Sequence, residues 1–109
     1  MFGLFKKSVS APDLEFLFLL AAIDAVETGA PTSRLCELIE KLLNCTLEEG
    51  RLKLSEYQWG GVRAAASRVA IDSRLRDLLK NCRGEGGDLS PLAVQNVADV
   101  LRKGGCTFG

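Results

Sequence analysis

The side chains of this chain that could perform acid–base or metal chemistry are carboxylates and thiols, because the sequence contains no histidine. Histidine is the commonest general base and metal ligand, and it usually activates a serine or cysteine nucleophile. Carboxylate pairs could still give and take a proton, and the close pairs are Asp24 with Glu27 and Glu48 with Glu49. Their helical spacing places them on exposed positions, where a solvated charge is the expected role. We therefore expect no catalytic residue.

The cysteines are the next candidates for chemistry, and there are four of them: Cys36, Cys45, Cys82 and Cys106. No two of them have the short spacing that is typical of a zinc site. They occupy apolar, helix-like positions, and a domain of 109 residues can be stable without disulfides. We expect four free thiols, no metal, no cofactor and a cytoplasmic location.

Phosphate recognition is the other chemistry that the sequence offers, in the basic segment 51–83. Arginines bind phosphates and aromatic rings stack on bases. The candidate nucleic-acid contacts are Tyr57, Trp59, Arg63, Arg74, Arg76 and Arg83. On one continuous helix, Arg63 and Arg74 would share one face, and Arg76 and Arg83 another. A nucleic-acid-binding domain is usually strongly basic, however, whereas this chain has zero net charge and an isoelectric point of about 6.3.

The charges are segregated along the chain even though they cancel in total. Residues 8–50 hold eight acids and two bases, whereas residues 51–83 hold eight bases and three acids. Such segregation either holds the two halves together or presents opposite charges to partners, and the sequence leaves both outcomes open. The candidate partner-binding residues of the acidic half are Asp24, Glu27, Glu37, Glu40, Glu48 and Glu49.

The elements that must position these side chains are helices. The chain is 47% hydrophobic with only 6% aromatic residues, and Leu, Ala and Val dominate, which favours helix packing. Ser10, Ser55 and Ser90 have the residue type and context of helix N-caps. The spacing of apolar residues predicts helices over 12–28, 33–47, 55–82 with an interruption near Asp72, and 91–103.

These helices predict an all-α fold, a compact bundle of four to five helices in one domain over 1–109. We expect an N-terminal tail over 1–9 and a flexible C-terminal tail over 104–109. The helix over 12–28 is apolar around most of its circumference, so it should be the centre of the core. The expected core includes Leu17, Leu20, Ile23, Ile39, Leu42, Val69, Leu78, Val97 and Leu101. A faint similarity between 29–43 and 87–101 is consistent with two packed helical hairpins.

These observations favour a non-catalytic protein-binding module whose acidic half covers a basic surface of another protein. Small inhibitor, immunity and adaptor proteins act in this way. The alternative is a nucleic-acid-binding helical module that uses the region from Arg63 to Arg83. A homodimer is compatible with the sequence. The apolar cluster of Phe2, Leu4 and Phe5 either contacts a membrane or packs on the core, and no apolar segment reaches the roughly 20 residues of a membrane-spanning helix.

Overall fold

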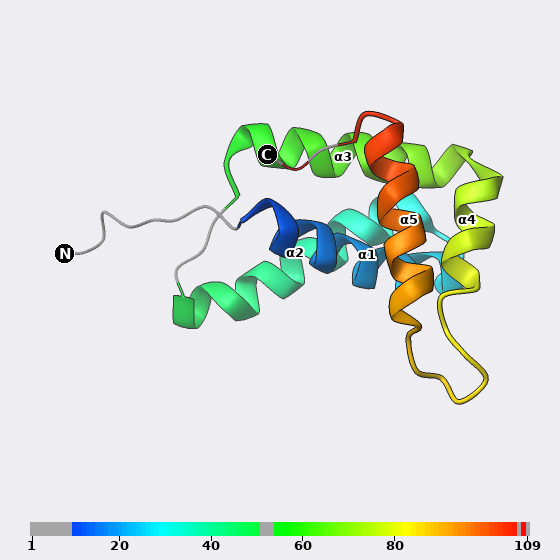
Figure 1. Cartoon of the computed structure of the whole chain (residues 1–109). Coiled ribbons are helices and arrows are strands. Elements are labelled where there is room, and N and C mark those ends of the chain that lie inside the picture. The colour runs from blue at the N-terminus through cyan, green and yellow to red at the C-terminus, as the bar shows by residue number, and fades with distance from the viewer. Residues whose placement is uncertain (1–9, 51–53, 107, 109) are drawn as a thin grey trace.

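The fold is an all-α bundle, as the composition predicts (Figure 1). The computed structural model describes residues 10–50, 54–106 and 108, and for 44–50 only the backbone. Within these residues the helices are α1 (Ala11–Thr28), α2 (Pro31–Gly50), α3 (Glu56–Ile71), α4 (Ser73–Lys80) and α5 (Pro91–Lys103). None of them is long and apolar enough to cross a membrane.

The helix ends follow the capping signals. Ser10 accepts a hydrogen bond from the Asp13 amide at 3.3 Å, and Ser55 forms a reciprocal capping box with Gln58. Gly29 ends α1 in the left-handed conformation, with φ of 84°. The bounds of α5 match the predicted helix over 91–103. Helix α2 begins two residues earlier than predicted, at Pro31, because proline suits the first position of a helix.

The predicted interruption near Asp72 is confirmed, and it divides the third helical region into α3 and α4. Asp72 has an extended backbone, and its carboxylate accepts hydrogen bonds from the amides of Arg74 and Leu75 at 3.0 and 3.1 Å. The side chain thereby satisfies two amides that begin the new helix. The basic residues upstream and downstream of Asp72 therefore lie on different helices.

Helix α1 is the centre of the core, as its apolar circumference predicts. It contacts each of the other four helices in the described structure. Its side chains of Leu14 and Phe18 are fully buried. Helices α1 and α2 form one hairpin, and α4 and α5 form another, joined by a loop in which Arg83 and Leu89 make an isolated bridge. Helix α3 lies between the two hairpins in the chain and packs against α2.

The predicted core residues divide into two groups. Those that are buried are Ile23, Ile39, Val69, Val97 and Leu101. Those that are only half-buried are Leu17, Leu20, Leu42 and Leu78. The apolar pattern identifies the buried face of each helix. Which residues of that face become fully buried depends on the angle and position at which neighbouring helices cross.

The segment after α5 differs from the flexible tail that the sequence suggests. Gly105, with φ of 88°, turns the chain back, and the Cys106 amide donates a hydrogen bond to the Leu101 carbonyl at 3.0 Å. Phe108 is 3% exposed, and its ring centroid lies 5.3 Å from that of Phe18. The described part of this segment is therefore a component of the core. The expected N-terminal tail over 1–9 lies outside the described residues.

Candidate docking face between α1 and α5

An apolar groove lies between the first half of α1 and α5. Its volume is about 460 Å³. The apolar side chains that line it are Pro12, Phe16 and Leu19 of α1, Pro91, Val94 and Ala98 of α5, and Leu89 of the preceding loop. Glu15 and Gln95 are its polar members. We call this groove, together with the exposed apolar side chains of Phe16 on α1 and Leu92 on α5, the α1–α5 face.

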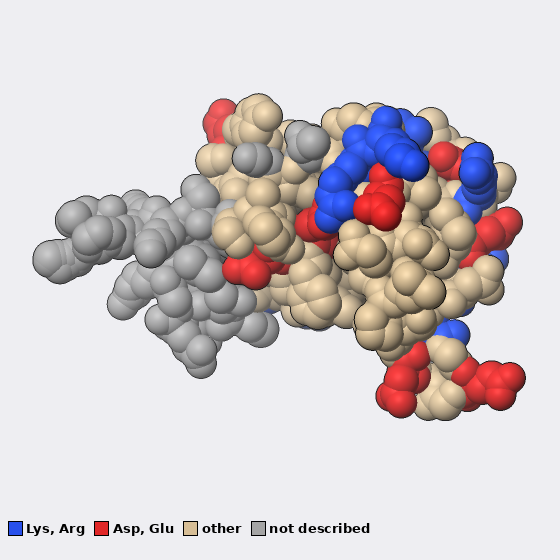
Figure 2. Space-filling model, viewed as in Figure 1, with Lys and Arg blue, Asp and Glu red and all other residues tan. Residues whose placement is uncertain are grey.

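The α1–α5 face exposes more apolar surface than folding requires. Phe16 is 56% exposed, and Leu92, in the first turn of α5, is 72% exposed. Figure 2 shows this side of the molecule as a largely uncharged surface over α5. Helix α1 is apolar on nearly every side, and its other sides are covered by neighbouring helices. Large exposed apolar side chains at a groove are typical of a protein-binding site.

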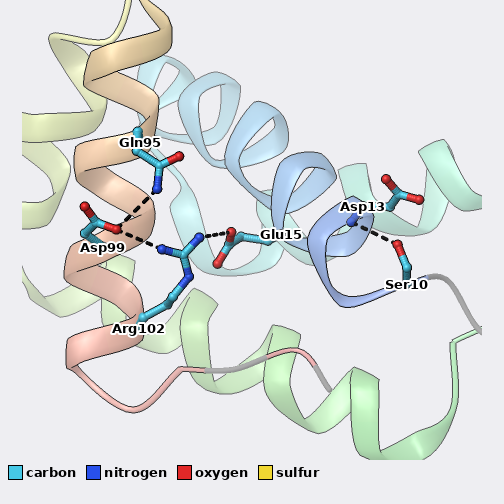
Figure 3. Close-up of polar contacts among 6 residues, drawn as sticks. All are labelled: Ser10, Asp13, Glu15, Gln95, Asp99 and Arg102. Carbon is cyan, nitrogen blue, oxygen red and sulfur yellow. Dashed lines mark hydrogen bonds and ion pairs between the residues drawn. The ribbon is translucent and has the colours of Figure 1, made fainter.

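A polar cluster fixes one edge of the groove (Figure 3). The guanidinium of Arg102 on α5 donates to Glu15 on α1 at 2.7 Å and to Asp99 at 2.8 Å. Gln95 donates to the same Asp99 oxygen at 3.2 Å. Only 15% of the Glu15 side chain is exposed, so water screens this ion pair less than a surface pair. The cluster joins two helices that are far apart in the sequence at one edge of the groove.

A second hollow, of about 680 Å³, lies where α3, α4 and the segment after α5 meet. Arg68 lines this hollow and donates a hydrogen bond to the Gly104 carbonyl at 3.1 Å. The Arg68 guanidinium lies so close to Gly104 that a Cβ there would come within 2.6 Å of it. Arg68 therefore holds the segment after α5 in place, and neither the spacing nor the composition of the sequence indicates this role.

The candidate acidic residues are partly neutralised within the protein. Arg34 pairs with Asp24 at 3.5 Å and with Glu37 at 3.2 Å. Glu27 pairs with Arg83 of the basic segment at 2.9 Å. The segregated charges therefore hold the two halves together at one point at least.

The other candidate acids are less constrained by the structure. Glu40 is exposed on α2 and has no ion pair within the described part of the chain. The side chains of Glu48 and Glu49 lie outside the part that the structure describes. The acidic surface available to a partner is thus smaller than the count of carboxylates suggests.

The predicted alignment of arginines on shared helical faces is wrong. Arg63 lies on α3 and Arg74 on α4, so the break at Asp72 separates them. Arg76 also lies on α4, whereas Arg83 follows its end at Lys80. Both alignments require a continuous helix, but the Asp72 cap interrupts it between Arg63 and Arg74, and the end of α4 at Lys80 interrupts it before Arg83.

Several of these basic side chains already have partners inside the protein. Arg76 donates to the Ala70 carbonyl at 3.0 Å, across the break between α3 and α4. Arg83 donates to Glu27 and also to the Gly87 carbonyl at 3.0 Å. Arg63 lies over the Trp59 ring, 5.8 Å from its centroid.

The remaining candidates are exposed. Tyr57 is 72% exposed in the first turn of α3, and Arg74 is exposed at the start of α4. The six candidate nucleic-acid contacts are thus divided among α3, α4 and the segment that follows α4.

The thiols of Cys36, Cys82 and Cys106 are free, and the side chain of Cys45 is not among those described. Burial raises the pKa of the Cys82 thiol, which donates to the Leu78 carbonyl at 3.4 Å. Burial likewise raises the pKa of Cys36; nearby Arg63 opposes this shift, and Glu40 adds to it. Among the described side chains, no three of the His, Cys, Asp or Glu type converge in a way that could hold a metal ion.

The fold is a small helical bundle, and its α1–α5 face holds an apolar groove between two helices. Comparisons with protein-family models, with curated proteins and with solved structures find no match for this chain. Its function must therefore be argued from the described surface itself.

Proposed function

We propose that this protein is a non-catalytic protein-binding module and that the α1–α5 face receives its partner. The observation that carries the proposal is the apolar groove together with Phe16 in its lining and Leu92 on the first turn of α5, two of the four large apolar side chains that are most exposed in the described structure. Burying both side chains would remove a substantial apolar area from water. The ion pair of Arg102 with Glu15 supplies a rigid polar edge, which lowers the conformational cost of binding.

The acidic half remains part of the proposal as a second contact. The partner could be an enzyme that is inhibited, a toxin or the target of an adaptor. A basic surface on it would be attracted to Glu40, which is exposed, and to Glu37, whose side chain is 66% exposed. Because Arg34 and Arg83 offset much of the charge nearby, we expect these acids to affect the rate of association more than the affinity.

Nucleic-acid binding is the less supported alternative. Arg76 and Arg83 are engaged by carbonyl and carboxylate groups of the protein itself, and phosphate would have to displace these contacts. The overall charge of zero supplies no long-range attraction to a polyanion.

A cytoplasmic location belongs to the same proposal. The free thiols of Cys36, Cys82 and Cys106 support it, because reduced cysteines persist in the cytosol.

The test is capture of partners by the tagged protein from its native cells, followed by mass spectrometry. Phe16→Glu places a charge on the α1–α5 face, and Ile71→Glu is the matched control, because Ile71 is 83% exposed and lies away from this face. Ile71 lines the second hollow, so the two variants also distinguish the two hollows, and we expect Phe16→Glu to lose the captured protein and Ile71→Glu to retain it. Equal capture by both variants would refute the assignment of this face.

The same preparations distinguish the other classes. Loss of binding in Glu37→Lys with Glu40→Lys would assign a contribution to the acidic surface. The ratio of absorbance at two wavelengths shows whether nucleic acid copurifies with the protein. If it does, and if only replacement of Arg63, Arg74 and Arg76 removes it, the protein is the nucleic-acid-binding module of the alternative.

A further inference from the structure

We propose that the occupant of the α1–α5 face is a second copy of this chain, bound about a two-fold axis that passes through the middle of the face. This inference rests on the proposed function of the face and identifies the partner. It follows from the distribution of charge around the groove and from the shape of its apolar side chains.

Opposite charges flank the face at its two ends. Figure 2 shows Lys and Arg side chains over the C-terminal end of α5, and Asp and Glu on the loop beyond its N-terminal end, with uncharged surface between. The residues concerned are Arg102 and Lys103 at one end and Glu85 and Asp88 at the other, and all four are exposed. Arg102 is engaged by Glu15 and Asp99, so Lys103 is the cation that a partner would meet.

A two-fold rotation makes this pattern complementary to itself. It places the C-terminal end of α5 of one copy against the 85–88 loop of the other, and the same contact recurs at the opposite end. In such an isologous interface, each residue pair occurs twice. Lys103 of each copy would then face Glu85 or Asp88 of the other copy. A net charge of zero leaves no overall repulsion between two copies.

The apolar side chains are also arranged for self-association. Leu92 protrudes from the first turn of α5 at 72% exposure, and Phe16, Leu19 and Val94 line the groove. The rotation would bring Leu92 of each copy toward the groove of the other. A standard interface takes roughly 800 Å² from each partner, about an eighth of the 6534 Å² of accessible surface of this chain. The groove and the two charged ends together provide a face that spans the length of α5.

The first experiment measures the mass of the full chain by sedimentation equilibrium in a reducing buffer, which excludes disulfide-linked dimers. We expect a concentration-dependent shift from 11.8 kDa toward twice that mass. Phe16→Glu and Leu92→Glu should each abolish the shift, whereas Ile71→Glu should retain it. All three positions are exposed, so the helical content of each variant should equal that of the original protein.

The second experiment tests the two-fold arrangement by exchanging charges. Lys103→Glu alone, and Glu85→Lys with Asp88→Lys in a second variant, should each weaken the homodimer about tenfold or more, because both copies of the contact become repulsive. An equimolar mixture of the two variants should dimerise again, because every contact in the mixed dimer joins opposite charges. A mixture that remains monomeric would refute the two-fold arrangement.

Two other outcomes would overturn this inference. One is a monomer at all concentrations, and the other is a dimer that neither Phe16→Glu nor Leu92→Glu disrupts. If the chain is monomeric but Phe16→Glu still loses a different captured protein, the proposed function of the face stands and only its occupant is wrong. If neither self-association nor capture depends on Phe16, both proposals fail.

Discussion

Phe108 should contribute strongly to stability although it lies in a segment without helix or strand. Its side chain is 3% exposed and packs against Phe18, with ring centroids 5.3 Å apart. Truncation of a buried phenylalanine to alanine costs about 3 to 5 kcal/mol. The cost is smaller where the surrounding structure can move and no rigid cavity remains, and the segment after α5 can detach from the core. We therefore expect Phe108→Ala to lower the free energy of unfolding by about 2 to 4 kcal/mol.

The assay is urea unfolding followed by circular dichroism, combined with the rate at which an alkylating reagent modifies Cys106. A domain of this size has a total stability of about 5 to 15 kcal/mol, so the loss should be a large share of it. Cys106 is 7% exposed and lies two residues before Phe108. Its alkylation should become faster in Phe108→Ala, since detachment of the segment exposes both residues.

Tyr57→Ala is the matched control, because this aromatic residue is 72% exposed. Its effect on the free energy of unfolding should stay within about 0.5 kcal/mol, as is usual for surface sites. If Phe108→Ala changes stability as little as the control does, and Cys106 reacts at an unchanged rate, the segment after α5 is not part of the core.

Three further predictions concern the helices and the thiols. Asp72→Ala removes the cap of α4 and should lower the free energy of unfolding by about 1 kcal/mol, measured by urea unfolding. Leu101→Ala should cost about 2 to 5 kcal/mol in the same assay, and Leu42→Ala less, because Leu101 is fully buried and Leu42 only half-buried. Burial raises the pKa of Cys82, so the unfolded thiol ionises first, and the free energy of unfolding should fall as the pH rises past the ordinary pKa of a thiol. Cys82→Val should remove part of this decline, and an identical pH dependence in both proteins would contradict the assignment.

The helices and most of their ends could be predicted from the sequence, because these features depend on neighbouring residues. The Ser10 cap, the capping box of Ser55 with Gln58, and Gly29 at the end of α1 each satisfy backbone groups within a few residues. The break at Asp72 is also local, because its side chain accepts hydrogen bonds from the amides two and three residues further along the chain. The apolar circumference of α1 likewise predicts its central position, because a helix without a polar face must be covered on several sides.

The candidate site depended on contacts that no local pattern encodes. Apolar spacing shows which face of a helix is buried, but not which two faces meet. The groove exists because α1 and α5 lie side by side, and the ion pair of Arg102 with Glu15 joins residues at opposite ends of the sequence. The pairing of Glu27 with Arg83 likewise joins residues 56 positions apart.

The sequence by itself therefore determined an all-α bundle, its central helix and its capped helix ends, because backbone hydrogen bonding and helical periodicity are local. Only the tertiary structure decided which carboxylates are neutralised, that Phe108 enters the core, and that Phe16 is left uncovered at a groove. These outcomes depend on the distances between side chains on different helices, and such distances are fixed only when the helices pack.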